Sequence, residues 1–308
     1  HYKHVQLTKR WLNCADIAHL LLYGKITTFN IMSEFVLAPM SKSELSNFFD
    51  DDSLKVIQFF LQKSLVSQPE TLPGQKDIPI QIPKEHIEQW IVQALNARPV
   101  GSGSYPVDVL GDDWAADVKM LSCKVNENGS LKNSDSGETS LSQKFSSTVF
   151  DKNNTLDELF SRKEHKLIWD KWQQILTDKY KVVNDDHGIT KIYYFIVLRA
   201  GSIFHLCGLK LNLDLLSNTE IDYSNTTETT IWINNFINKE FGKVKIYKSK
   251  KRVELRLRPK AWVSSGLTLD FDSKFENTNI NIKSAIQQGN LSDHIADHLI
   301  PILKKTSG

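Results

Sequence analysis

The sequence predicts a mixed α/β protein in which helices flank a central mixed β-sheet and a helical region forms the N-terminal part. Three observations support this fold class. Apolar residues recur at helical spacing near the start of the chain, two β-rich runs near residue 110 are separated by turn residues, and a later helical stretch precedes an apolar β run. Helices that alternate with such strands are typical of a sheet covered by helices.

The composition is that of a globular protein. The chain has 308 residues, of which 40% are hydrophobic and 24% charged, enough to bury a large core. No apolar run approaches the roughly 18 residues that span a bilayer, and His1–Arg10 precedes no export-type apolar segment. Cys14, Cys123 and Cys207 lack CxxC spacing, which argues against disulfides and cysteine zinc sites. A cytoplasmic protein without membrane contact is expected.

The first region, residues 7 to about 68, has an interrupted helical pattern. Ser41 and Glu44 form a capping-box signature for one short helix. Asp50–Ser53 then separates this helix from a second one at Leu54–Lys63. Two short helices this close fit a helix-turn-helix, and they fit an ordinary packed helix pair as well.

A proline-rich segment follows the helical region. Residues 68–83 contain four prolines and a glycine, so no helix can run through them. This segment predicts a boundary between an N-terminal region, residues 1–80, and a second domain, residues 81–308. The second domain begins with a predicted helix at Lys84–Ala97, which presents one apolar face.

The remaining elements are predicted from local patterns. Tyr105–Leu110 and Ala115–Leu121 are β-rich runs joined by Gly111–Trp114, which has hairpin chemistry. A polar loop is expected from Asn126 to Ser142. The later predicted elements are a helix at Thr155–Tyr180, strands at Lys191–Leu198 and Phe204–Leu213, a helix at Thr230–Phe241, strands at Val244–Tyr247 and Arg252–Arg258, and a helical stretch at Ile282–Leu303 that Gly289 can break.

The predicted hairpin brings two acids together. If residues 111–114 form the turn, Asp108 lies opposite Asp117, and Lys119 points to the same side as Asp117. Two facing carboxylates repel unless a cation neutralises them. Mg²⁺ binds a few carboxylate or carbonyl oxygens, so Asp108, Asp117 and the carbonyl of Val118 are candidate ligands. Lys119 could orient a metal-bound water beside a phosphodiester.

This pattern resembles the active site of the PD-(D/E)xK nuclease superfamily. Asp108, Asp117 and Lys119 match its acids and lysine, although Val107 separates Asp108 from the proline at 106. The element order over about residues 84 to 200 is similar to that family's core and implies a restriction-endonuclease-like sheet. The resemblance also implies that Glu88, on the preceding helix, is an additional acid of the catalytic site.

The resemblance implies a type II restriction endonuclease. Such an enzyme is a Mg²⁺-dependent, sequence-specific endonuclease for double-stranded DNA and usually a homodimer, as a palindromic target requires. Two alternatives stay open at this point. One is another nuclease of the superfamily, acting in repair, junction cleavage or transposition. The other is a non-catalytic DNA-binding protein.

A basic segment follows at residues 239–260. The 38 basic and 36 acidic residues of the chain nearly cancel, so this local cluster is informative where net charge is not. It can contact DNA phosphates or base edges, and a solvated basic face explains it equally well. Gly101–Ser104 lacks the ending of a phosphate-binding P-loop, so no nucleotide cofactor is expected. The candidate DNA-binding residues are Lys243, Lys245, Lys248, Lys250, Lys251, Arg252, Arg256 and Arg258.

Overall fold

The computed structural model describes residues 34–76, 80–100, 105–142, 155–272 and 279–304. The predictions made for residues 1–33 and for Gly101–Ser104 lie outside the described residues. The described residues belong to one compact unit that begins at Glu34. The boundary predicted after residue 80 is therefore not where the chain divides, because the helices before and after that point pack against the same sheet.

A mixed sheet forms the centre of the described unit, as the sequence predicts. Its order is β1-β7-β6-β4-β3-β2, with β12 also paired to β7, which makes seven strands within the described residues. β4 and β6 are parallel and the other pairs are antiparallel. The strands are β1 (Leu37–Pro39), β2 (Arg98–Pro99), β3 (Val109–Leu110), β4 (Trp114–Ser122), β6 (Lys191–Ala200), β7 (Ile203–Leu211) and β12 (Leu269–Asp272).

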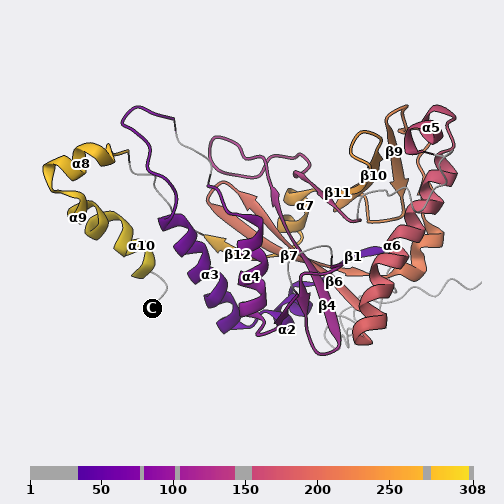
Figure 1. The fold of residues 1–308 in the computed structure, drawn as a ribbon, viewed down its shortest axis with the longest axis horizontal. Helices are drawn as coiled ribbons and strands as arrows, with labels where there is room; N and C mark the ends of the chain where they lie inside the picture. Colours follow the sequence, from indigo (N-terminus) through magenta and orange to yellow (C-terminus); the bar gives the residue numbers. More distant parts are fainter. Residues whose placement is uncertain (1–33, 77–79, 101–104, 143–154, 273–278, 305–308) are drawn as a thin grey trace, which may run out of the picture. The chain divides into compact units, whose positions relative to one another are not determined.

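Three helices cover one face of this sheet: α2 (Lys42–Phe48), α3 (Asp51–Val66) and α4 (Lys84–Ala94) (Figure 1). The predicted Ser41–Glu44 capping box starts α2, and the Asp50 carboxylate caps α3. Only two residues join α2 to α3, and both helices bury apolar side chains against the sheet. An ordinary packed pair describes this arrangement, and DNA contact by the pair stays a prediction.

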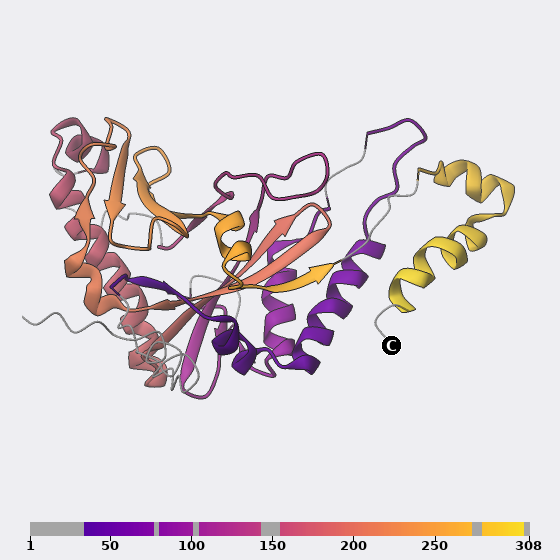
Figure 2. The ribbon, with the colours of Figure 1, turned by 180° about the vertical axis from the view of Figure 1, so that it is seen from behind.

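The other face carries α6 (His165–His187), and α5 (Leu156–Ser161), which precedes it, lies beside the strands of a second sheet (Figure 2). The single helix predicted at Thr155–Tyr180 is thus two helices. Lys163 between them has a φ of 58°, a left-handed conformation that interrupts the helical path. α6 then continues beyond Tyr180 until Gly188, whose φ of 67° ends it. Lys179 and Tyr180 in the second half of α6 contact β4 and β6.

A second sheet, in the order β5-β11-β10-β9-β8, was not predicted as a unit. Two predictions fail in it. The segment expected to be a helix at Thr230–Phe241 begins with a strand, Thr230–Asn234, because its β-branched and aromatic residues pair with β10, and its remainder is not helical. The loop expected at Asn126–Ser142 contains a strand that pairs with β11. The strands are β5 (Glu138–Ser140), β8 (Glu220–Ile221), β9 (Thr230–Asn234), β10 (Gly242–Tyr247) and β11 (Arg252–Leu257).

The C-terminal helical stretch is broken at Gly289, as predicted; the φ of this residue is 76°. Among the described residues, no helix has both the length and the apolar character that a membrane span requires. The remaining helical elements are a 3₁₀ helix (Leu213–Asn218), α7 (Pro259–Ser264), α8 (Ile282–Gln288), α9 (Leu291–His294), a π-helical turn (Ile295–Leu299) and α10 (Ile300–Lys304).

Candidate functional site

The β3–β4 hairpin has the predicted register. Val109 pairs with Ala116 and Leu110 pairs with Ala115. The turn depends on Gly111, because a Cβ atom there would lie 2.2 Å from the indole of Trp114. The backbone N–H of Gly111 donates to the Trp114 carbonyl at 2.8 Å and closes the turn. Local turn chemistry therefore fixes which residues of the two strands face each other.

Asp108 lies where the β3–β4 ladder ends. Its backbone N–H donates to the Ala116 carbonyl at 2.9 Å, and its carboxylate Oδ2 accepts the Val118 N–H at 2.7 Å. The Asp108 carboxylate thus accepts a hydrogen bond that a backbone carbonyl would accept if β3 were longer. Pro106, two residues earlier, has no N–H to extend the ladder. The predicted pairing of Asp108 with Asp117 is replaced by this contact, which still holds the two acids on one side of the sheet.

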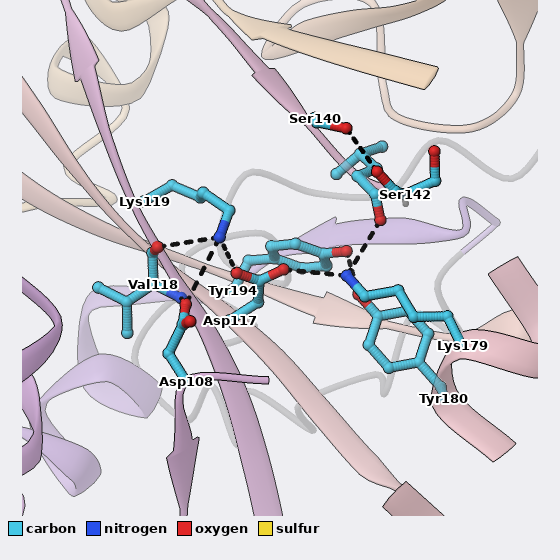
Figure 3. A network of polar contacts seen from close by, with 10 residues as sticks. Asp108, Asp117, Val118, Lys119, Ser140, Ser142, Lys179, Tyr180 and Tyr194 are labelled. Atoms are coloured by element: carbon cyan, nitrogen blue, oxygen red, sulfur yellow. Dashed lines mark hydrogen bonds and ion pairs between the residues drawn. The ribbon is translucent and has the colours of Figure 1, made fainter. Parts of the chain in front are cut away.

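The Lys119 ammonium lies among the three groups that the sequence predicts as metal ligands. Its Nζ lies 3.1 Å from the Val118 carbonyl oxygen and 3.5 Å from Asp108 Oδ2, and it is hydrogen-bonded to Asp117 Oδ1 (Figure 3). The side chains of Asp108, Asp117 and Lys119 are 19%, 6% and 13% exposed. Two carboxylates and a carbonyl oxygen therefore converge on one positive charge in a partly closed site.

A second lysine, not predicted from the sequence, contacts the other side of Asp117. Lys179 on α6 donates to Asp117 Oδ2 at 3.1 Å, to the Leu141 carbonyl at 3.1 Å and to the Tyr180 hydroxyl at 3.0 Å (Figure 3). Its side chain is 7% exposed. Tyr180 in turn is hydrogen-bonded to Tyr194 of β6. Asp117 is thus held between two ammonium groups.

A sequence signal for Lys179 does exist. The buried residues of α6 follow 3-to-4 spacing, and Lys179 falls on the same face, between Leu176 and Val183. A lysine on the apolar face of a helix is costly to bury without a partner. That pattern indicates that Lys179 needs a partner of opposite charge, but it does not say which element supplies the partner.

The two acids have pKa values shifted in opposite directions. Burial, then the charge of Asp117, raises the pKa of Asp108 to about 6. Burial also acts to raise the pKa of Asp117, but the charges of Lys179 and then Lys119 outweigh it and lower this pKa to about 2. Asp117 is therefore ionised at every working pH, while Asp108 titrates close to neutrality. Such a divided pair is typical of sites that bind cations or move protons.

Glu88, the predicted additional acid, lies half-buried on α4. α4 covers the face of the sheet that carries Val109 and Val118. Asp117 and Lys119 point toward the opposite face, which α6 covers. The participation of Glu88 in the site stays a prediction.

The basic segment is largely neutralised by acids from other elements. Lys245 is 5% exposed, and its ammonium lies over the rings of Trp232 and Tyr247. Lys245 is therefore engaged within the protein, and DNA contact by this residue stays a prediction. Arg252 is exposed. The other six candidate DNA-binding residues form ion pairs. Lys243 and Arg258 pair with Asp135, Lys248 and Lys251 with Asp157, and Lys250 and Arg256 with Glu138.

The oxygen set around Lys119 fits a magnesium ion in chemistry. Carboxylate and carbonyl oxygens are the hard ligands that Mg²⁺ prefers, and the Lys119 ammonium marks the point where a cation is stabilised. The site supplies two carboxylates; no group of three or more His, Cys, Asp and Glu side chains suited to a metal occurs in the part of the chain that the structure describes. Comparisons with family models, with curated proteins and with solved structures find no match.

Proposed function

We propose that this protein is a Mg²⁺-dependent endonuclease that hydrolyses phosphodiester bonds in double-stranded DNA, similar to the type II restriction endonucleases of the PD-(D/E)xK superfamily. The observation that supports the proposal is the convergence of Asp108, Asp117 and the Val118 carbonyl on the Lys119 ammonium. The same hairpin, followed by a long helix and a strand parallel to β4, also fits that family's order of elements.

In this proposal each residue of the site has a defined role. Asp108, Asp117 and the Val118 carbonyl hold Mg²⁺, which supplies activation of a water molecule and stabilisation of negative charge when it is bound. Lys119 keeps a positive charge on the same face, where it stabilises the charge that develops on the attacked phosphate. Lys179 keeps Asp117 ionised and binds its Oδ2, which leaves Asp117 Oδ1 facing the proposed metal position.

Sequence-specific cleavage, a homodimer and a cytoplasmic location belong to the same proposal. A palindromic target requires two-fold symmetry in the protein, so a dimer is expected when the enzyme cuts both strands. Sedimentation of the protein with and without duplex DNA tests this point. A monomer under both conditions would contradict it.

The activity is tested by incubating mixed plasmid DNA with the protein and Mg²⁺, with EDTA as a control. Discrete fragments support a restriction endonuclease, and a smear indicates cleavage without sequence preference. Asp117→Asn and Lys119→Met are expected to lower the rate by at least about 10²-fold, the usual effect of losing a charge-stabilising group. The matched control is Asp113→Asn in the turn of the same hairpin, because this carboxylate is 68% exposed and pairs only with Lys191 among the described residues.

Intact DNA at all divalent metal concentrations would refute catalysis. Binding of duplex DNA is then the deciding measurement. If the wild type binds duplex DNA, and Asp108→Ala, Asp117→Ala and Lys119→Ala bind it equally well, the protein is a non-catalytic DNA-binding protein. Cleavage that depends on junctions or breaks and not on a short sequence would indicate a repair, junction or transposition nuclease.

A further inference from the structure

A cavity of about 730 Å³ opens where β4 ends. Three separate segments form it: the end of β4, the polar loop before β5 and the end of β11. Its lining residues are Ser122, Cys123, Lys124, Asn133, Ser134, Asp135, Ser136, Gly137, Arg256 and Arg258. The central sheet and the second sheet thus both contribute to one open site.

The cavity lining has an excess of positive charge. The lining contains three basic residues, Lys124, Arg256 and Arg258, and one acid, Asp135; Glu138, outside the lining, pairs with Arg256. Arg258 Nε lies 3.9 Å from Asp135 Oδ1, so these two side chains form a loose ion pair. Burial raises the pKa of the Cys123 thiol to about 12, so this side chain adds no negative charge. The lining therefore favours an anion.

Two residues of the cavity lining each carry a buried hydrogen-bond donor that is unpaired among the described residues. Arg256 Nε and the Ser134 hydroxyl have no hydrogen-bond partner among the described residues. Buried polar atoms are rarely left unpaired, and an oxyanion can accept from both a guanidinium and a hydroxyl. Arg256 also pairs with Glu138 through Nη2, which fixes the guanidinium in place. The cavity lining thus contains a guanidinium and a hydroxyl beside Lys124 as candidate donors to phosphate oxygens.

The cavity lies along the strand that carries the candidate catalytic residues. Ser122 is three residues beyond Lys119 on β4, which corresponds to about 10 Å at the rise of a strand. One strand of duplex DNA advances about 3.4 Å per nucleotide along the helix axis. A backbone that crosses the site could therefore place a nearby phosphate at the cavity.

We propose that this cavity binds a phosphate group of the DNA backbone a few nucleotides from the attacked bond. This inference rests on the proposed function, because that function makes duplex DNA the source of the phosphate. It assigns positioning of the substrate strand to Lys124, Ser134 and Arg256. The remaining basic residues of the second sheet are engaged mainly in ion pairs within the protein.

Binding of a labelled duplex, measured by fluorescence anisotropy with Ca²⁺ in place of Mg²⁺, tests the proposal. Lys124→Gln is expected to weaken binding of every sequence and to lower the slope of log affinity against log salt by about 0.9, the contribution of one phosphate contact. Ser134→Ala should weaken binding about twofold to tenfold without changing the slope, because a hydroxyl carries no charge. Lys181→Gln, an exposed lysine on α6, is the control and should bind like the wild type.

A second arm separates the possible sources of phosphate. Pyrophosphate is added without DNA, and the thermal unfolding of the wild type and of Lys124→Gln is compared. If duplex DNA binds but both cavity variants behave like Lys181→Gln, this inference is overturned while the nuclease proposal stands. If no duplex binds but pyrophosphate stabilises only the wild type, the cavity is a site for a free phosphate compound, and both the backbone assignment and the nuclease proposal fail. No response in either arm overturns both.

Discussion

Replacing Lys179 by methionine should destabilise the folded protein by about 3 kcal/mol. Loss of one partner from a buried ion pair typically costs about 3 to 5 kcal/mol, because the other charge stays buried. The lower end applies here because Lys119 still contacts Asp117 after the change. Methionine is apolar and unbranched like the lysine stem, so little of the loss comes from packing.

Urea unfolding monitored by tryptophan fluorescence measures this effect, since Trp169 and Trp172 on α6 are buried. Lys181→Met on the exposed side of the same helix is the control and should change the free energy of unfolding by no more than about 0.5 kcal/mol. Asp117→Asn combined with Lys179→Met should recover at least about 1 kcal/mol relative to the sum of the single changes. A Lys179→Met protein as stable as its control, or strictly additive effects, would refute the buried pair.

Three further changes test other parts of the structure. Burial raises the pKa of Asp108 from 3.8 to about 6, so ionisation of this carboxyl destabilises the folded state. The free energy of unfolding should therefore contain a component that falls as pH rises from about 4 to 6. Urea titrations without divalent metal should show that Asp108→Asn lacks this component. Gly111→Ala should cost about 1 to 3 kcal/mol in the same assay, because the new Cβ meets the indole of Trp114, and an unchanged midpoint would contradict the turn geometry. Thr219→Val should cost about 1 to 3 kcal/mol in thermal or urea unfolding, since it removes the acceptor of the buried Trp169 indole N–H at 2.8 Å; a neutral effect would argue against that hydrogen bond.

The parts of the site that sequence predicts are those set by neighbouring residues. The turn at Gly111–Trp114 and strand alternation determine the hairpin register, and with it the shared side of Asp108, Asp117 and Lys119. The capping box at Ser41 is equally local. Short-range geometry is written directly in the order of residues, so these predictions needed no knowledge of the rest of the chain.

The parts that sequence missed depend on contacts between distant segments. Lys179 meets Asp117 across 62 residues of chain, and no local pattern says which element will face α6. The helix predicted at Thr230–Phe241 failed for the same reason: its spacing permits a helix, but pairing with β10 decides its structure. Ion pairs within the basic segment likewise use acids more than 90 residues earlier, such as Asp157 with Lys251 and Glu138 with Arg256.

The charge balance of the site links metal and substrate binding under the proposed function. Asp108 and Asp117 contribute two negative charges once both are ionised, and Lys119 and Lys179 contribute two positive charges, so the cluster is neutral without a metal. A divalent cation added to a neutral, largely buried cluster leaves an excess of positive charge, which costs free energy in a site of low polarity. A phosphodiester brings negative charge to the same place and removes this excess. Metal and DNA should therefore each strengthen the binding of the other, and the free site should hold Mg²⁺ only weakly.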